Sequence, residues 1–544
     1  MRSAGDILKE ILRNRGIIDS RDISEFLSDR PKKTYDPFLL MNMEAGVDLL
    51  LSEINSGSRI CIYGDYDADG VTSICILSHI IGMLTDNFTY YIPSRFSEGY
   101  GLNKNALAAI KDEGTDLIVT VDCGSVSYEE VEYAKTLGMK IIVTDHHSID
   151  DIKADCILIN PKQKGCGYPF KDLAGCGVAF KMAQAIRQRT DLPKSAVNDV
   201  LDLVAIGTVG DIVSLTDENR TIVKYGLNRA NCGERKALKK MKDAISIDFI
   251  TSESIAYGIV PHINAAGRMS SAYDAAELFL TCDENIMEEK ILKLKELNSR
   301  RKKLQEEAYE RCMEEVSEEE NMVILDMPDI HEGIAGIVAG KIKDTVNRPV
   351  IIVTPTEEGF MKGTGRSIPG VDIYRLLKNH EEMFIRFGGH SGACGFLCSR
   401  ENLEKLKSDL QHDMDMMLEN DSSLLDHSVT YDMEISPHEV TVEAARLLEK
   451  LEPFGQGNPK PLFRMTKIRS VIVKFLGEDG SHARFTAVSE TGERADCILF
   501  QKGKEYREML ISDEWKDVIG SIRLQRWRGR ESVQFVVEEM FLWK

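Results

Sequence analysis

The sequence predicts a multidomain α/β protein: a mostly parallel sheet, a second α/β domain joined to it by a long helix, and a C-terminal β-barrel. In the first half of the chain, apolar runs of strand length alternate with helical segments, which is typical of a parallel sheet covered by helices on both faces. Residues 283–320 are densely charged and contain neither Pro nor Gly, as expected of a long exposed helix. From about residue 466, short β-rich runs are separated by turns, which is the pattern of a small barrel.

The chain has 544 residues, more than one hydrophobic core accommodates, so several domains are expected. Changes in pattern along the chain suggest where they meet. We predict a helical lead-in over residues 1–55, the parallel-sheet domain over 56–282, the connecting helix over 283–320, the second α/β domain over 321–460 and an OB-like barrel over 461–544.

The first domain contains short, β-rich apolar runs, which predict strands. In chain order they are RICIYG, FTYYIP, DLIVTV, KIIVT and CILI. The segments between them, such as VTSICILSHIIGML and VSYEEVEYAKTLG, have the length and spacing of helices. Because strands and helices alternate, we expect parallel strands.

In the second domain, MVILDM and PVIIVT are the expected strands, and they flank the helix GIAGIVAGKIKD. The Gly-rich segments KGTGRSIPG and FGGHSGACGF are expected to form loops whose backbone a ligand can approach closely. In the barrel, Arg523, Arg526, Arg528 and Arg530 surround Trp527. Cations interleaved with a ring suit a single-stranded nucleic acid, and the alternative is a solvated strand anchored by Trp527.

Composition argues against some classes of function. No run approaches the roughly 18 apolar residues of a membrane span, and the first residues lack the apolar core of a signal peptide, so we expect a cytoplasmic protein without a membrane. The 12 cysteines form no CxxC pair, which argues against a zinc site. The net charge of −20 argues against nucleic acid, but from Pro461 onward there are 15 Lys and Arg against 13 Asp and Glu.

A group of carboxylates, Asp65, Asp67 and Asp69, follows the first expected strand in the loop GDYDADG. Like charges this close raise one another's pKa, and a bound divalent cation removes the unfavourable repulsion. Gly70 permits a tight turn into the next helix. An Asp-rich loop can also be a plain solvated loop, so this motif alone leaves both interpretations open.

Further candidate ligands follow other apolar runs. Asp122 follows DLIVTV, His146 comes shortly after KIIVT, and Asp211 follows the apolar run in GTVGDIVSL. Because ligands collect at the carboxyl ends of parallel strands, we expect these side chains to converge. Carboxylate and imidazole ligands suit Mn²⁺ or Mg²⁺, and several bridging carboxylates suggest two ions, as in phosphodiester hydrolysis. The sequence has no Walker loop and no GxSxG motif.

The motifs YGDYDADG, VDCG, TDHH and VGD, in this order, resemble the signature motifs of the DHH phosphoesterases. Other segments resemble those of the RecJ exonucleases of this superfamily: SRFSEGYGL, LAGCGVAFK, PHINAAGRM, HEGIAGIVAGKI, GTGRSIPG, FGGHSGACGF and EPFGQGNP. The resemblance covers nearly the whole chain. It implies a DHH domain, a DHHA1 domain and an OB-fold, in a two-metal enzyme that digests single-stranded DNA from the 5′ end during repair and recombination.

The resemblance also implies roles for individual residues. The metal ligands would be Asp65, Asp67, Asp69, Asp122, His146 and Asp211. The catalytic residues would be His147 beside the scissile phosphate, Asp122, and Asp145 as the residue that orients the histidines. Substrate contacts would come from Arg95, Arg268, Thr364, Arg366, Ser367, Gly388, Gly389, His390, Arg526, Trp527 and Arg528. The planar fork of Arg suits phosphate oxygens. The alternatives are arginines that are simply exposed and a structural His390.

The family further implies single-stranded DNA with a 5′ end as substrate, a helicase and a single-strand-binding protein as partners, and a monomeric enzyme. Two other interpretations remain open. One is a DHH phosphodiesterase of short oligonucleotides or RNA, which usually lacks the terminal barrel. The other is a non-catalytic replication-helicase scaffold of the same fold, which loses metal ligands that this sequence retains.

Overall fold

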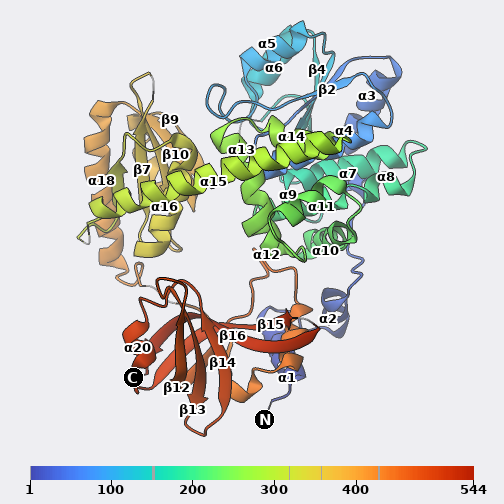
Figure 1. The fold of residues 1–544 in the computed structure, drawn as a ribbon. Helices are drawn as coiled ribbons and strands as arrows, with labels where there is room; N and C mark the ends of the chain where they lie inside the picture. The colour runs from blue at the N-terminus through green and yellow to red at the C-terminus, as the bar shows by residue number, and fades with distance from the viewer. Residues whose placement is uncertain are drawn as a thin grey trace. The chain divides into compact units, whose positions relative to one another are not determined.

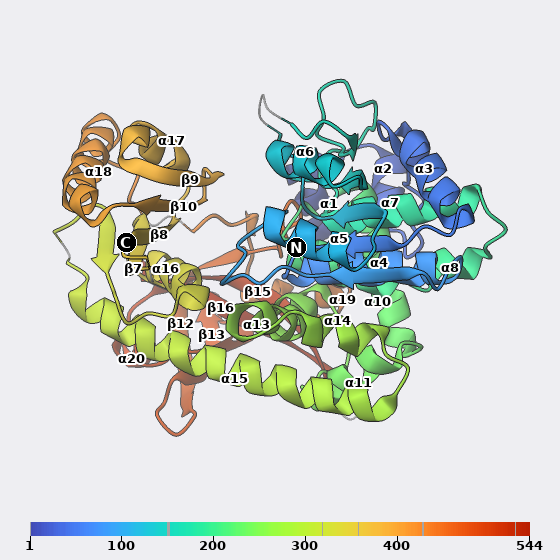
Figure 2. The same ribbon diagram turned by 90° about the horizontal axis from the view of Figure 1, so that it is seen from above.

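The computed structural model describes residues 2–149, 153–317, 319–356, 358–426, 429–527 and 529–543. They form two compact units (Figure 1). Unit 1 comprises Met1–Ile263, Ala275–Ile291 and Val429–Lys544, and unit 2 comprises Asn264–Asp274 and Leu292–Ser428. The expected long helix is confirmed as α15 (Glu284–Glu315), one uninterrupted helix that begins in unit 1 and continues into unit 2 (Figure 2).

Unit 1 contains the predicted parallel sheet, with strand order β2-β1-β3-β4-β5. Its strands are β1 (Ile60–Tyr63), β2 (Phe88–Tyr91), β3 (Leu117–Val121), β4 (Lys140–Thr144) and β5 (Ile157–Ile159). All pairings among them are parallel, which confirms the expected fold class. Because the strands are parallel, their carboxyl ends lie at the same edge of the sheet.

Helices cover both faces of this sheet. On one face, Leu107 of α5 (Lys104–Asp112) and Val131 of α6 (Tyr128–Thr136) pack against Ile118 and Val143. On the other, Gly46 of α3 (Met43–Asn55) approaches so closely that an added Cβ would meet Ile159 Cδ1 at 2.7 Å. The other helices of this part of the chain are α4 (Ala68–Gly82), α7 (Gly175–Gln188), α8 (Lys194–Asn198), α9 (Leu201–Gly210), α10 (Asp217–Cys232), α11 (Lys236–Ala244), α12 (Ser252–Ser254), α13 (Val260–Met269) and α14 (Tyr273–Leu280).

Unit 2 is built on a sheet of order β6-β7-β8-β10-β9. Its strands are β6 (Val323–Asp326), β7 (Val350–Pro355), β8 (Met361–Arg366), β9 (Phe384–His390) and β10 (Ala393–Cys398), and its helices are α16 (Glu332–Val346), α17 (Ile373–Lys378) and α18 (Arg400–Asn420). The expectation that the Gly-rich segments form loops is wrong, because most of their residues lie in β8, β9 and β10. Glycine provides space here: a Cβ on Gly363 would meet the Phe396 ring at 2.1 Å.

The terminal barrel belongs to unit 1 and has strand order β11-β12-β13-β14-β16-β15, closed by pairing of β12 with β15. Its strands are β11 (Met433–Glu434), β12 (Phe463–Leu476), β13 (His482–Ser489), β14 (Arg494–Leu499), β15 (Lys516–Trp527) and β16 (Arg530–Leu542), with helices α19 (Val442–Glu449) and α20 (Arg507–Ile511). A closed five-stranded barrel formed by β12–β16 fits the expected OB-like architecture.

The limits of the barrel differ from the expected 461–544. Met433 of β11 and Ala444 of α19 are buried in the barrel core, as are Ile7 and Ile11 of α1 (Ala4–Asn14). The segment from Val429 onward thus belongs to unit 1, although the sequence pattern assigned residues up to 460 to the second domain. The first helix likewise packs with the far end of the chain, and Ile23, Phe26 and Leu27 of α2 (Ser20–Leu27) also pack against the barrel core, whereas α3 packs on the parallel sheet.

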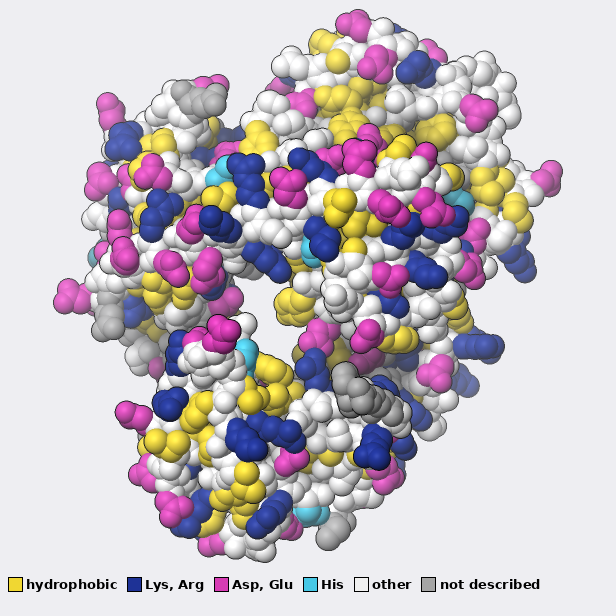
Figure 3. Space-filling view, in the orientation of Figure 1, with side chains coloured by type: hydrophobic (Ala, Val, Ile, Leu, Met, Phe, Trp, Pro, Cys, Tyr) yellow, Lys and Arg dark blue, Asp and Glu magenta, His cyan; other side chains and the backbone are white. Residues whose placement is uncertain are grey.

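Charged side chains of both signs intermingle over the face of the molecule shown in Figure 3. The net charge of −20 thus reflects 88 Asp and Glu against 68 Lys and Arg, and the acidic protein also has many basic side chains. Within the described ranges, no helix has both the length and the apolar character needed to cross a membrane.

Glu452 lies between Leu451 of the barrel core and Pro453, and burial together with the nearby Glu449 raises its pKa to about 7. Glu452→Gln is therefore expected to stabilise the protein at pH 8 by roughly 1–3 kcal/mol and to have little effect below pH 5. A raised carboxyl pKa gives stability that is present below about pH 4.5 and lost as the pH rises through 7, and Gln stays neutral throughout. Thermal unfolding at both pH values measures the difference.

The control is Glu478→Gln, which changes an exposed carboxylate in the loop between β12 and β13. It should leave the pH dependence of unfolding as in the wild type. An equal gain for Glu452→Gln at pH 5 and pH 8 would show that titration of Glu452 is not the cause.

Candidate metal centre

The loop between β1 and α4 turns tightly and directs carboxylates inward. Asp67 is the N-cap of α4, and its Oδ1 accepts hydrogen bonds from the backbone N–H groups of Asp69 at 2.9 Å and Gly70 at 3.1 Å. A Cβ on Gly70 would meet the Asp65 carbonyl oxygen at 2.5 Å, so the turn requires glycine. As a result, Asp65 and Asp69 are almost entirely buried.

Asp69 faces the N-terminus of α7. Its carboxylate accepts hydrogen bonds from the N–H groups of Gly175 at 2.6 Å and Cys176 at 2.8 Å. The positive end of the helix dipole favours a negative charge at this position. A Cβ on Gly175 would meet Asp122 Oδ1 at 2.5 Å, so this glycine lets α7 approach two carboxylates at once.

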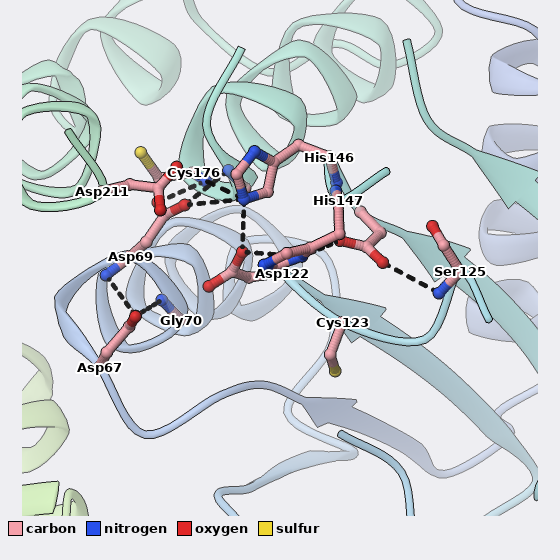
Figure 4. A network of polar contacts seen from close by, with 12 residues as sticks. Asp67, Asp69, Gly70, Asp122, Cys123, Ser125, His146, His147, Cys176 and Asp211 are labelled. Atoms are coloured by element: carbon pink, nitrogen blue, oxygen red, sulfur yellow. Dashed lines mark hydrogen bonds and ion pairs between the residues drawn. The ribbon is translucent and has the colours of Figure 1, made fainter. Parts of the chain in front are cut away.

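His146 is the point on which the other candidate ligands converge (Figure 4). Its Nε2 lies 3.1 Å from Asp122 Oδ1, 3.4 Å from Asp211 Oδ2 and 3.8 Å from Asp69 Oδ2. Asp122 follows β3 and His146 follows β4, as expected, whereas Asp211 lies at the C-terminal end of α9. Carboxyl ends of strands and the end of a helix therefore deliver side chains to one place.

Three overlapping groups of side chains each have their ligand atoms within 4.8 Å of one another. They are Asp69, His146 and Asp211; Asp65, Asp67 and Asp122; and Asp122, His146 and His147. Asp122 belongs to the second and third groups, and its Oδ1 lies 3.1 Å from His146 Nε2 of the first. These side chains would suit two divalent cations.

The unsatisfied polar atoms of this centre fit a metal. Buried atoms of Asp65, Asp122, His146 and Asp211 lack a hydrogen-bond partner among the described residues. Burial, then repulsion from Asp69 and other carboxylates, raises the pKa of Asp122 well above its usual range and that of Asp211 to about 9. These carboxylates cannot all be charged without a counter-cation, and oxygen ligands with one imidazole suit Mn²⁺ or Mg²⁺.

Burial lowers the pKa of His146 to about 4 and so keeps its imidazole neutral, which is the form that binds metals. Among the described residues, no hydrogen bond satisfies either ring nitrogen. A neutral ring with a free nitrogen facing carboxylates is consistent with a ligand rather than an ion-pair partner.

Asp145 lies outside these groups and fixes the backbone of the two histidines. Its Oδ1 accepts hydrogen bonds from the backbone N–H groups of His146 at 2.7 Å and His147 at 3.1 Å, and its Oδ2 accepts one from Ser125 at 2.9 Å. The Nδ1 atom of His147 lies 2.7 Å from Asp145 Oδ1. This geometry suits the predicted orienting role of Asp145.

His147 is partly exposed beside the buried ligands. Burial opposes its charged form, but the hydrogen bond to Asp145 and the surrounding carboxylates outweigh burial and raise the pKa of His147 to about 9. The same hydrogen bond, working against burial, lowers the pKa of Asp145. At neutral pH the metal-free protein therefore presents an imidazolium next to Asp122.

Tyr100, Asn160 and Lys162 also lie at this centre, although they are not among the residues predicted from the sequence. Tyr100 Oη donates to the Asp122 carbonyl oxygen at 3.3 Å and lies 3.1 Å from the His147 ring nitrogens. Asn160 follows β5 and donates to the His147 carbonyl oxygen at 2.9 Å, and the charge of Lys162 acts on both His146 and Asp211. Because ligands collect at the carboxyl ends of parallel strands, the polar residues that follow the apolar run CILI could have pointed to Asn160 and Lys162. The glycines on both sides of Tyr100 could have pointed to a loop that approaches the site.

Arg95 is near the same edge of the sheet. Its guanidinium carbon lies 5.4 Å from the centre of the Tyr66 ring, and its charge opposes the rise in the pKa of Asp65 that burial causes. The structure thus brings this predicted phosphate contact close to the carboxylate cluster.

In unit 2, Arg268, Thr364 and Arg366 surround one side of α16. Arg268 donates to the Gly333 carbonyl oxygen at 3.2 Å. A Cβ on Gly336, one turn further along α16, would meet Arg366 Nη2 at 2.8 Å and Thr364 Cγ2 at 3.1 Å. The two arginines are therefore neighbours on a small-residue face of this helix.

The other predicted contacts of unit 2 are more dispersed. Ser367 Oγ donates to the Val371 carbonyl oxygen at 2.7 Å, which is a structural interaction. His390 is exposed at the end of β9, where its Nδ1 accepts from the Gly392 N–H at 3.2 Å. Gly389 has φ +142° and a Cβ there would meet the Ala393 carbonyl oxygen at 2.3 Å, whereas Gly388 faces open space.

In the barrel, Arg526 is engaged in ion pairs. It donates to both carboxylate oxygens of Glu449, at 2.9 and 2.6 Å, and to Glu531 at 3.2 Å. The side chain of Trp527 and the whole of Arg528 lie outside the described residues. A nucleic acid that contacts Arg526 would compete with these carboxylates.

Comparison with known families agrees with this architecture. Residues 59–208 match the DHH family, N-terminal domain, residues 319–414 match the DHHA1 domain, and residues 431–539 match the RecJ OB domain. The last match begins close to β11, in line with the barrel core described above.

Curated relatives match along nearly the whole chain. The single-stranded-DNA-specific exonuclease RecJ of Salmonella typhimurium is 34% identical, over 98% of this chain and 96% of the relative. The protein of the same name from Bacillus subtilis is 33% identical, over 98% of this chain and 67% of the relative. The crystal structure of RecJ in complex with Mn²⁺ from Thermus thermophilus has a TM-score of 0.83 at 26% identity, covering 98% of this chain and 75% of that one.

In the metal-free protein, His147 is expected to titrate with a pKa of about 9, and Asp145→Asn should lower that pKa because it removes the carboxylate that stabilises the imidazolium. NMR correlation spectra of the histidine ring nitrogens against pH measure both values, with His147→Gln identifying the signal. Asp155→Asn changes an exposed carboxylate of the same unit and is the control. An unchanged His147 titration in Asp145→Asn would contradict this interpretation.

Proposed function

The chain belongs to the RecJ family of single-stranded-DNA-specific exonucleases, and we propose that it degrades single-stranded DNA from the 5′ end by two-metal phosphodiester hydrolysis. The observation that carries the proposal is the convergence of Asp122 and Asp211 on a neutral His146, beside the second carboxylate group. A non-catalytic scaffold would not need this buried and electrostatically unfavourable cluster.

The side chains of the centre would have different roles in phosphodiester hydrolysis. Two bound divalent cations would activate a water and stabilise charge on the attacking and leaving oxygens. The residues proposed to hold them are Asp65, Asp67, Asp69, Asp122, His146 and Asp211. The charged imidazole of His147, oriented by Asp145, would donate a hydrogen bond to an oxygen of the scissile phosphate.

Recognition of the single-stranded DNA would come from basic side chains in both units, including the barrel. Arg366 and Thr364 lie against α16, and Arg268 of α13 contacts the same helix. Together they form a group that suits a terminal phosphate, because guanidinium groups donate in a planar fork. Arg95 would contact the backbone near the metals. The barrel would bind single-stranded DNA through Arg526, Trp527 and Arg528, as interleaved cations and rings do in other OB-folds.

Family membership also motivates proposals about the cellular setting. We propose that the chain acts as a monomer in the cytoplasm, in DNA repair and recombination. A helicase that exposes single strands and a single-strand-binding protein are the proposed partners.

The direct test is digestion of end-labelled, 5′-phosphorylated single-stranded DNA with Mn²⁺ or Mg²⁺. We expect mononucleotides to be released from the 5′ end, and Asp122→Ala to abolish their release because two of the three ligand groups contain Asp122. Asp112→Ala, at an exposed position on α5, is the matched control and should remain active.

Other outcomes would replace the proposal. Consumption of only very short oligonucleotides would favour the small-oligonucleotide phosphodiesterase, and cutting of RNA in preference to DNA would favour an RNA-directed relative. Binding of DNA without cleavage in either metal would favour the scaffold.

Arg366→Ala is expected to remove the preference for a 5′-phosphate. The loss of a charge-assisted hydrogen bond should lower kcat/KM on 5′-phosphorylated DNA by roughly 10- to 100-fold and leave 5′-hydroxyl DNA nearly unaffected. Initial rates on the two substrates measure the ratio. Arg400→Ala removes an exposed arginine of unit 2 and is the control, and an equal loss on both substrates would argue against phosphate recognition by Arg366.

A further inference from the structure

The turn after α9, which carries Asp211, has a strained backbone. Ile212 has φ +59°, in the left-handed region that is unfavourable for a β-branched residue. Its side chain is 71% exposed, so the packing of Ile212 itself does not hold this conformation. Such residues persist only where the surrounding structure fixes them.

Contacts from the barrel side of unit 1 reach the segment 214–216, which follows this turn after one residue. The N–H of Leu215, a buried residue, donates to the Gln456 carbonyl oxygen at 2.8 Å. Gly457 lies directly against the same segment, because a Cβ there would meet Ser214 Oγ at 2.3 Å and Thr216 Cγ2 at 3.2 Å. The loop 451–459, which contains EPFGQGNP, therefore touches residues 214–216, which are separated from the Asp211 turn by one residue.

Hydrogen bonds within the loop hold its backbone together. The buried Asn458 donates from Nδ2 to the carbonyl oxygens of Leu451 at 2.8 Å and Pro453 at 2.7 Å. Gly455 and Asn458 exchange two backbone hydrogen bonds, at 3.0 and 3.1 Å. These contacts give the loop a defined shape against which the Asp211 turn can rest.

Two further contacts attach the loop to the parallel-sheet part of unit 1. Ser252 Oγ donates to the Phe454 carbonyl oxygen at 2.7 Å. Arg220, which is almost fully buried, donates to the Leu451 carbonyl oxygen at 2.9 Å. The loop is thus held on both sides of the segment that reaches Leu215.

We propose that loop 451–459, through Gln456 and Gly457, positions Asp211 for metal binding, so that docking of the barrel tunes the affinity of the metal centre. This inference rests on the proposed role of Asp211 as a ligand. Asp211 Oδ2 lies 3.4 Å from His146 Nε2, and a small displacement of the turn would take the carboxylate out of reach of a shared ion. Gln456 and Gly457 are positioning residues that act through the backbone after Asp211.

Gly457→Ala tests the proposal, because the added methyl group pushes on Ser214 while none of the candidate ligands is itself substituted. We expect Mn²⁺ affinity of the DNA-free protein to fall by about tenfold or more, as is typical when groups supporting a metal ligand are changed. Titration with Mn²⁺, with the free ion followed by electron paramagnetic resonance, measures this without any catalytic turnover.

Gly492→Ala is the matched control. Gly492 has φ +85°, similar to the +72° of Gly457, but an added Cβ there meets nothing within 4 Å. It therefore has the same backbone penalty without pressure on the turn, and should bind Mn²⁺ like the wild type. Ser214→Ala combined with Gly457→Ala removes the oxygen that the new methyl group meets, and should restore most of the affinity.

Asp211→Ala distinguishes the role of Asp211 as a metal ligand from the positioning role of Gly457. Weaker Mn²⁺ binding by Asp211→Ala with unchanged binding by Gly457→Ala would overturn the positioning role alone. Wild-type binding by both would remove Asp211 from the metal centre and the inference with it. Equal losses in Gly457→Ala and the double variant would also overturn the inference, because the contact with Ser214 would then not be the cause.

Discussion

The mutual repulsion of buried carboxylates at one edge of the parallel sheet is the constraint on which the rest of the structure depends. Burial of Asp65, Asp69 and Asp122 is unfavourable in itself, and their proximity adds to it. Such a cluster persists in a folded protein only if cations and donors compensate it. The backbone N–H groups at the N-terminus of α7 and the glycines next to the carboxylates each contribute to that compensation.

At several places glycine lets the backbone approach the carboxylates of this cluster closely. Gly70 lets the chain turn against Asp65, and Gly175 lets the start of α7 reach Asp69 while it contacts Asp122. In both places a methyl group would meet an atom at about 2.5 Å, so alanine cannot replace glycine without displacement of the Asp65 backbone or of the Asp122 side chain. Backbone N–H groups fixed in this way stabilise charge without the loss of side-chain entropy that Lys or Arg would entail.

Much of this could be predicted from the sequence, because the rules involved are local. The alternation of strands and helices predicts the parallel sheet, and parallel strands bring Asp122 and His146 to one edge whatever lies between them. What could not be predicted depends on contacts between distant segments. The apolar pattern of α1 does not reveal that Ile7 packs in the barrel core, and the glycines of β8 look like a loop until the Phe396 ring is seen to occupy the space that they leave.

The acidic character of the chain bears on how it can hold DNA. Arg526, one of the residues of the barrel that the sequence suggests for DNA binding, is paired with Glu449 and Glu531. Exposed pairs of this kind contribute little to stability, and a phosphate can replace a carboxylate partner at small cost. The pairing nevertheless reduces the attraction that Arg526 exerts on a distant DNA strand, because the charges of its two carboxylate partners offset its own. An acidic exonuclease can in this way confine the attraction of Arg526 to strands already in contact with it.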